Sequence, residues 1–121
     1  MAAECVEAIR DRLRNRRRRY KRDLEQEAER LTAEAAALGV QQVILFGSAV
    51  WGDPGLASDV DLLVVWDTPL DFLERTVALY RLLQPRVALD LLVYTPAEME
   101  AMMHRPFVRR VVEEGRVLYE S

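Results

Sequence analysis

Three aspartates stand out because each lies in or beside an apolar stretch that otherwise reads as a buried strand. Asp59 and Asp61 stand at the start of the run VDLLVVW, residues 60–66, and Asp90 lies between two leucines in a later run. A carboxylate is costly to remove from water unless a cation meets it. Because successive strand residues face opposite sides of a sheet, we expect Asp59 and Asp61 to project from the same face.

The three carboxylates meet at one end of a sheet if the two strands that carry them are neighbours. Their mutual repulsion would then be severe without a divalent cation. Oxygen ligands alone suit Mg²⁺ or Mn²⁺ rather than zinc, and two aspartates one pleat repeat apart can hold one such ion or bridge two. Taken alone, Asp90 is read equally well as a buried residue that pairs with an arginine.

A Gly-Ser pair follows the preceding apolar run. Gly47 and Ser48 are expected to open a short helix over residues 49–51. Backbone N–H groups at such a turn bind phosphate, glycine allows a close approach, and the Ser48 hydroxyl adds a donor. Alone, a Gly-Ser turn is usually only a turn, and an Asp-x-Asp pair is often a strand start or a helix cap. Together they predict phosphoryl or nucleotidyl transfer.

Hydrophobic periodicity predicts the elements that position these residues. The expected elements are strands at 40–46, 60–66 and 87–95 and helices at 3–38, 70–83, 96–105 and 107–114. Helices that alternate with buried strands indicate an α/β or α+β fold, in which a small mixed sheet is flanked by helices. Within one structural domain, we expect residues 1–38 to form a helical extension and residues 39–121 to form the catalytic unit.

The first helix raises a question of length and charge. At 1.5 Å per residue it would be about 54 Å long, which exceeds the diameter of a small domain, so it must break, overhang or pack on a partner. Residues 10–22 carry nine basic side chains and one acid, a net charge of +8, whereas the whole chain carries −3. We read this arginine run first as a solvated face. The alternative is a surface for an acidic partner or for a second copy, which would make a homo-oligomer.

Several classes of protein are disfavoured by composition. Nucleic-acid binding is disfavoured, because the arginine run contains no glycine and only one aromatic residue, Tyr20, which is not the pattern of interleaved residues that RNA recognition uses. Cys5 is the single cysteine, so no disulfide forms within the chain, which suits a reducing compartment. The chain has no apolar run of about 18 residues and no signal-peptide pattern at its start. We therefore expect a cytoplasmic protein without a membrane partner.

The spacing of the motif resembles a known family. Gly47-Ser48, ten intervening residues, Asp59-x-Asp61 in apolar surroundings and Asp90 on a later strand are similar to the minimal nucleotidyltransferases of the DNA polymerase β superfamily. These short proteins are often encoded beside a HEPN-domain partner as a toxin–antitoxin pair. The similarity extends over roughly residues 30 to 119 and includes the closing Glu-Gly-x-x-Leu-Tyr pattern.

This resemblance implies roles for the same residues. ATP would bind with Mg²⁺ or Mn²⁺, with Gly47 and Ser48 at the β- and γ-phosphates. Asp59 and Asp61 would form the metal-binding pair, and Asp90 would share a metal and help to activate the incoming hydroxyl. In the toxin–antitoxin version the acceptor is a tyrosine of the HEPN toxin, which the attached AMP silences.

The chain departs from the family just after the Gly-Ser pair. Members commonly carry a basic residue there, where this chain has Ala49 and Trp51. An obvious contact to the triphosphate is therefore missing, unless the arginine-rich helix supplies the charge. Trp51 is expected to pack against the sheet rather than to stack on a base.

Two other functions stay open at this point. The protein could be a binding module that neutralises its partner by occlusion, with the nucleotide site as a vestige. It could also modify a small molecule such as an aminoglycoside, although such enzymes usually carry a second domain for that substrate. As for acceptor groups within the chain, the sequence does not single out one of its four tyrosines, which are Tyr20, Tyr80, Tyr94 and Tyr119.

Overall fold

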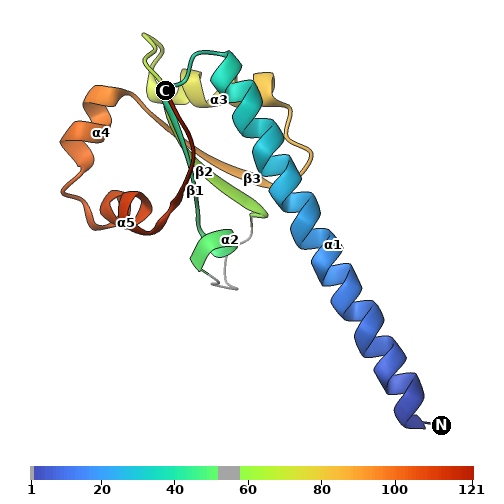
Figure 1. Ribbon diagram of the computed structural model, residues 1–121. Coiled ribbons are helices and arrows are strands. Elements are labelled where there is room, and N and C mark those ends of the chain that lie inside the picture. The colour runs from blue at the N-terminus through green and yellow to red at the C-terminus, as the bar shows by residue number, and fades with distance from the viewer. Residues whose placement is uncertain (1, 52–57) are drawn as a thin grey trace.

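A four-stranded mixed sheet forms the centre of the computed structural model, which describes residues 2–51 and 58–121 (Figure 1). Its strands are β1 (Gln42–Phe46), β2 (Val60–Val65), β3 (Leu89–Tyr94) and β4 (Arg116–Glu120). They lie in the order β3-β2-β1-β4, with β1 antiparallel to β2 and β4 and with β2 parallel to β3. The predicted fold class and its first three strands are confirmed with slightly shorter bounds, and β4 is an addition to the prediction.

Five helices within the described residues flank the sheet. They are α1 (Ala2–Ala37), α2 (Ser48–Trp51), α3 (Phe72–Leu83), α4 (Pro96–Met102) and α5 (Pro106–Glu114). Local sequence sets several of their ends. Asp71 caps α3 by accepting a hydrogen bond from the Glu74 backbone, and Thr95 with Glu98 forms a capping box at the start of α4. At Gly115, which ends α5, a Cβ would lie 2.3 Å from the Val111 carbonyl oxygen, so only glycine fits.

The two faces of the sheet carry separate apolar cores. On the first, which we call the α1/α3 face, alternate residues of β2 pack against α1 and α3. On the second, the α4/α5 face, the intervening residues of β1 and β2 pack against α4 and α5. The buried core residues of the α4/α5 face are Ile44, Phe46, Leu63, Val65, Met99, Val108 and Val111. Each large apolar side chain buried here stabilises the fold by about 1.5–3 kcal/mol.

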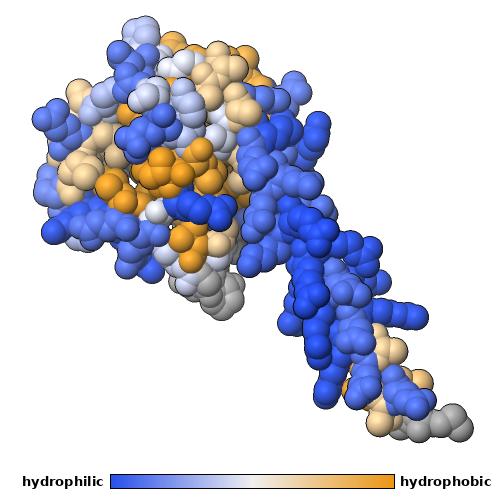
Figure 2. Space-filling view, in the orientation of Figure 1, coloured by the Kyte–Doolittle hydropathy of each residue, from blue (hydrophilic) through white to orange (hydrophobic). Residues whose placement is uncertain are grey.

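Helix α1 runs unbroken along the first face and then beyond it (Figure 1). Ala28, Leu31 and Ala35 are buried in the core, whereas residues 3–23 are exposed. Of the three outcomes expected for a helix of this length, the overhang is the one observed. Figure 2 shows it as mostly hydrophilic, with apolar side chains near its tip. No helix in residues 2–51 and 58–121 is long and apolar enough to cross a membrane. The domain boundary at residue 38 stays a prediction, although residues 24–37 of α1 lie over the core.

A buried carboxylate fixes the course of α1 over the sheet. Glu27 accepts hydrogen bonds from Arg30 Nε at 2.6 Å and from the Arg86 backbone N–H at 2.6 Å. Arg30 in turn donates to the carbonyl oxygens of Leu83 and Gln84 at the end of α3. The hydrogen bond from Arg30 lowers the pKa of Glu27, so the carboxylate is charged at neutral pH. These contacts tie α1 to α3 and to the loop before β3.

Candidate functional site

The residues expected to carry chemistry gather at one end of the sheet. In the strand register Phe46 of β1 lies opposite Asp61 of β2, and Asp61 lies opposite Asp90 of β3. Gly47 and Ser48 directly follow Phe46, so they reach the same end. The ladder thus brings a Gly-Ser turn and a pair of aspartates together across three strands that are far apart in sequence.

The Gly-Ser turn has the conformation that its first residue favours. Gly47 has a φ of +78°, in the left-handed region that residues with a Cβ rarely adopt. Its carbonyl oxygen accepts hydrogen bonds from the backbone N–H groups of Val50 at 3.0 Å and Trp51 at 2.8 Å. The short helix expected after the turn is therefore present as α2, and Ser48 opens it.

Asp61 is a buried carboxylate with an incomplete set of hydrogen bonds. Its side chain is 1% exposed, and it lies on the α4/α5 face by alternation with Leu63 and Val65. The Ser58 hydroxyl donates to Oδ1, whereas Oδ2 has no hydrogen-bond partner among the described residues. Burial raises the pKa of Asp61, the hydrogen bond from Ser58 opposes the rise, and the charge of Asp90 adds to it.

Asp90 shares this face with Asp61 but lies in a different environment. The two residues are directly opposite in the parallel ladder, so their side chains project to the same side. Asp90 is exposed. The alternative prediction, that it is buried and paired with an arginine, is therefore wrong. Of the three carboxylates that were expected to meet, Asp61 and Asp90 therefore lie side by side on one face of the sheet.

Asp59 lies on the other face, which differs from the expectation that it would share a face with Asp61. Strand β2 begins at Val60, so strict alternation does not extend to Asp59. Its Oδ1 accepts a hydrogen bond from the Tyr20 hydroxyl of α1 at 2.5 Å, and its Oδ2 accepts one from the Ala88 backbone N–H at 3.1 Å. These contacts hold Asp59 on the α1/α3 face.

A divalent cation fits this end of the sheet in part. In the described part of the chain, no group of three Asp, Glu, His or Cys side chains is close enough to hold a metal ion. Two carboxylates, Asp61 and Asp90, are together, and the Asp61 Oδ2 is a buried oxygen without a partner. A cation would compensate such an oxygen, and an all-oxygen pair suits Mg²⁺ or Mn²⁺. Asp59 would join them only by giving up its hydrogen bond to Tyr20.

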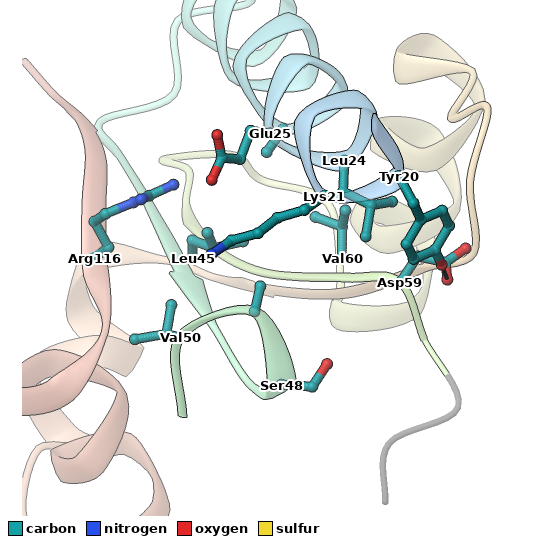
Figure 3. A pocket seen from close by; sticks show the side chains of 12 residues that line it. Tyr20, Lys21, Leu24, Glu25, Leu45, Ser48, Val50, Asp59, Val60 and Arg116 are labelled. Atoms are coloured by element: carbon teal, nitrogen blue, oxygen red, sulfur yellow. Dashed lines mark hydrogen bonds between the residues drawn. The ribbon is translucent and has the colours of Figure 1, made fainter. Parts of the chain in front are cut away.

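A cavity of about 390 Å³ lies on the α1/α3 face at the same end of the sheet. This volume is within the range of about 300–1,000 Å³ found for small-molecule sites. The polar side chains that line it are Ser48 of α2, Asp59, two cations and, from α1, Tyr20 and Glu25. Figure 3 shows the two cations, Lys21 from α1 and Arg116 from β4, extending into the space between the helix and the sheet.

Three residues that line this cavity were not among the site residues predicted from the sequence. Tyr20 and Lys21 lie within the arginine run, and Arg116 lies on the strand that was not predicted. Tyr20 carried a signal nevertheless, because it falls on the same helical face as Leu24 and Leu31, which point toward the sheet. The signal was masked by the surrounding arginines, which suggested a fully solvated face.

Trp51 packs against the sheet, as predicted. Its ring centroid lies 6.0 Å from that of Phe46, and it borders the core of the α4/α5 face. The guanidinium of Arg110, from α5, lies over the Trp51 ring, 3.8 Å from its centroid. An arginine from a different element therefore covers the position where the family commonly has a basic residue.

Comparisons with known proteins identify the family of the chain. Residues 24–119 match the family described as nucleotidyltransferase domain. A protein of Methanocaldococcus jannaschii, provisionally named a protein adenylyltransferase, is 35% identical over 80 residues, which are 66% of this chain and 79% of that protein. The matched range includes the Gly-Ser turn, all three aspartates and residues 24–37 of α1.

The fold has a counterpart among solved structures. A crystal structure of a Sulfolobus solfataricus protein, provisionally described as a nucleotidyltransferase, matches with a TM-score of 0.61. The match covers 84% of this chain and 85% of the other, at 21% sequence identity. At that identity the likeness concerns the fold, which is the mixed sheet with its flanking helices.

Proposed function

The chain belongs to the nucleotidyltransferase domain family and is a nucleotidyltransferase, and from this premise we propose a substrate and an acceptor. It transfers AMP from ATP, with Mg²⁺ or Mn²⁺, to a hydroxyl group of another protein. The acceptor is a tyrosine of a HEPN-type partner, and the chain acts as the antitoxin of that pair. The relative named a protein adenylyltransferase supports a protein acceptor, and the resemblance to minimal nucleotidyltransferases supports the partner.

The observation that carries this proposal is the pairing of Asp61 with Asp90. Fold stability alone gives no reason to bury a carboxylate with an unpartnered oxygen next to a second carboxylate. Such arrangements are typical of sites that bind a cation and work on charged substrates. The neighbouring turn of Gly47 and Ser48 supplies the phosphate-binding element that a nucleotide requires.

Each of these residues then has a distinct part in the reaction. Asp61 and Asp90 would hold the cation, and Asp59 would become a third ligand only after losing its hydrogen bond from Tyr20. A bound divalent cation would neutralise the phosphate charge and lower the barrier to displacement of pyrophosphate. Gly47 and Ser48 orient the β- and γ-phosphates, so that the acceptor oxygen attacks the α-phosphorus in line.

Positive charge for the triphosphate comes from elements outside the motif. Lys21 and Arg116 line the cavity together with Ser48. They stand in for the basic residue that Ala49 and Trp51 replace. This supports the expectation that α1 supplies charge to the site, since Lys21 lies within the basic segment 10–22.

A second candidate function is a binding module that occludes its partner without catalysis. The position of Asp59 favours it, because the Tyr20 hydroxyl occupies a carboxylate that catalysis needs. The exposed arm of α1 provides a surface for such a partner. The two candidates differ in whether nucleotide is consumed.

The test compares two positions of a radioactive label in ATP. With a HEPN-type protein as acceptor and Mg²⁺ present, label in the α-phosphate should become attached to the acceptor, whereas label in the γ-phosphate should leave with pyrophosphate. Asp61→Asn should attach no label. Stable complex formation without attached label would support occlusion. Attachment of the label from the γ-phosphate would show that the reaction is phosphoryl transfer and not nucleotidyl transfer.

A further inference from the structure

One tyrosine of this chain already lies where an acceptor hydroxyl must be. The Tyr20 Oη donates a hydrogen bond to Asp59 Oδ1 at 2.5 Å, across 39 residues of sequence. An acceptor group for transfer has to lie within hydrogen-bond distance of a carboxylate that can receive its proton. Tyr20 meets this requirement with Asp59, the aspartate that the family motif places two residues before Asp61.

The same tyrosine also lines the cavity that would hold the phosphates. Tyr20, Asp59 and Ser48 border one space of about 390 Å³, together with the cations Lys21 and Arg116 (Figure 3). A nucleophile, a carboxylate, a hydroxyl of the phosphate-binding turn and two positive charges are thus gathered in a single cavity. This is the set of groups that transfer to a hydroxyl requires.

Tyr20 is held in place by its helix and not by burial of its ring. The side chain is 55% exposed, so packing does not account for its position. The adjoining Leu24 and the Glu27–Arg30 pair fix α1 against the sheet and against the end of α3. The phenol is therefore presented by a rigid element while it stays accessible to solvent and to a nucleotide.

The other tyrosines lack this combination. Tyr80 is also exposed, at 43%, but it lies on α3 and does not line the cavity. Tyr94 and Tyr119 are half-buried and border the two cores. Among the described residues, Tyr20 is the tyrosine whose hydroxyl contacts an aspartate of the motif.

We infer that Tyr20 is itself an acceptor, so that the protein nucleotidylates its own α1 helix. This inference rests on the proposed function, since it uses the same ATP and the cation that Asp61 and Asp90 would hold, whereas Asp59 keeps its hydrogen bond to Tyr20 and serves as the base. In the reaction the Tyr20 Oη forms a bond to the α-phosphorus of ATP, and the bond from that phosphorus to the bridging oxygen of pyrophosphate breaks. The phenol proton passes to the Asp59 carboxylate, pyrophosphate leaves, and the product is the tyrosyl–AMP phosphodiester.

The modification has a consequence for the site. The phosphodiester has no proton to donate to Asp59, so the hydrogen bond between α1 and that carboxylate is lost. It also places a negative charge next to Asp59 and Glu25 in the cavity. Self-modification would therefore release Asp59 and separate α1 from this end of the sheet through charge repulsion.

Intact-mass spectrometry of the full chain tests the inference. Wild type, Tyr20→Phe, Tyr80→Phe and Asp61→Asn are incubated with ATP and Mg²⁺, and calorimetric titration of ATP is run on the same preparations. We expect wild type and Tyr80→Phe to gain the mass of one AMP group, with fragmentation assigning it to Tyr20. Tyr20→Phe and Asp61→Asn should gain no mass, although Tyr20→Phe should still bind ATP.

Each other outcome would overturn the inference in a distinguishable way. Cation-dependent ATP binding by wild type without added mass would refute self-modification and leave the proposed function standing. An absence of ATP binding would refute both. Added mass that persists in Tyr20→Phe would assign the acceptor elsewhere. Faster transfer to a partner by Tyr20→Phe, with no mass gain in wild type, would show that Tyr20 only blocks Asp59.

A mixing experiment tests whether the reaction is intramolecular. Tyr20→Phe, which keeps the aspartates, is mixed with Asp61→Asn, which keeps the tyrosine. Since Tyr20 contacts Asp59 of its own chain, we expect neither variant to gain mass in the mixture. Labelling of Asp61→Asn by its companion would contradict an intramolecular reaction and would indicate transfer between copies.

Discussion

Two aspartates of the same motif, Asp59 and Asp61, lie on opposite faces of one end of the sheet in opposite states. On the α1/α3 face, both oxygens of Asp59 accept hydrogen bonds, from Tyr20 and from Ala88. On the α4/α5 face, Asp61 is buried, and one oxygen has no partner in the described part of the chain. Both residues belong to one motif, so the motif does not determine how many hydrogen bonds each carboxylate accepts. The elements that pack over each residue determine it, and they leave one oxygen of Asp61 available to a ligand.

The largest effect that this comparison predicts is on catalysis at Asp61. A metal ion contributes several kcal/mol of charge stabilisation in the transition state, which corresponds to at least about 100-fold in rate. We therefore expect Asp61→Asn to lower AMP transfer by at least about 100-fold. Labelled transfer under saturating ATP measures it. If the variant kept more than about a tenth of the wild-type rate, Asp61 would not be a catalytic metal ligand.

Metal-free stability separates the two aspartates further. Burial raises the pKa of Asp61. The charged form of this side chain therefore destabilises the folded protein, by nothing at low pH and by more as the pH rises above the ordinary carboxyl value of about 3.9. In EDTA at neutral pH, we expect Asp61→Asn to be as stable as wild type or about 1 kcal/mol more stable. Asp59→Asn should gain no stability, because its carboxylate is already hydrogen-bonded. Denaturant unfolding across pH measures both variants.

The next largest effect is on stability, when a side chain that packs α1 against the sheet is truncated. Leu31 is fully buried, and truncation to alanine should cost about 2–5 kcal/mol. Leu13, on the same helical face of the overhang, is 47% exposed, and Leu13→Ala should change stability by less than about 0.5 kcal/mol. Urea unfolding of both variants checks this. Equal losses would mean that the overhang is packed in solution.

The anchor of α1 predicts a smaller and pH-dependent effect. Glu27→Gln should cost about 1–3 kcal/mol, because Arg30 and the Arg86 backbone lose their charged acceptor. The hydrogen bond from Arg30 lowers the pKa of Glu27, so its stabilisation is present above the ordinary Glu value of about 4.3 and is lost as the pH falls through the lowered one. The difference between wild type and variant should therefore shrink under acid.

The matched control for this anchor is Glu34, which pairs with the same arginine. Its side chain is 46% exposed, with 3.1 Å between Glu34 Oε1 and Arg30 Nη1. Glu34→Gln should cost less than about 1 kcal/mol. A loss as large as that of Glu27→Gln would show that the general charge of Arg30, rather than the buried contact, fixes α1.

The smallest predicted effect concerns the cover of the α4/α5 face. Arg110→Ala removes the cation over Trp51 and should cost about 0.5–1 kcal/mol. Arg109→Ala is the control, because Arg109 also forms an exposed ion pair four residues along the helix, at 3.7 Å against 2.7 Å for Arg110, and has no cation–π contact within the described residues. Thermal unfolding compares them. Equal stability of the two variants would show that the contact between Arg110 and the Trp51 ring does not stabilise the fold.

Local patterns in the sequence predicted most of the fold. Apolar runs and their stops placed β1, β2 and β3, and the Gly-Ser pair placed α2. The final strand was missed, because RVLYE has only five residues and its partner β1 lies more than 70 positions earlier in the chain. Short segments of this kind become strands through pairing, which a single sequence does not display.

The candidate site was predicted less completely, for a related reason. Alternation along an ideal strand predicted that Asp59 and Asp61 would share a face, but β2 begins at Val60, as expected, and alternation does not extend to Asp59 just before it. The orientation of Asp59 is set by Tyr20, which is 39 positions away. Pairing of Asp61 with Asp90 was predictable, because parallel neighbours align their side chains once the strands are adjacent.

Calorimetric titration of ATP, with and without Mg²⁺, tests the central claim most directly when wild type is compared with Asp61→Asn. A nucleotide site built on Asp61 and Asp90 predicts binding that requires the cation and is lost in the variant. Equal binding with and without Mg²⁺, or unchanged binding by Asp61→Asn, would contradict the claim that this end of the sheet is the nucleotidyltransferase site.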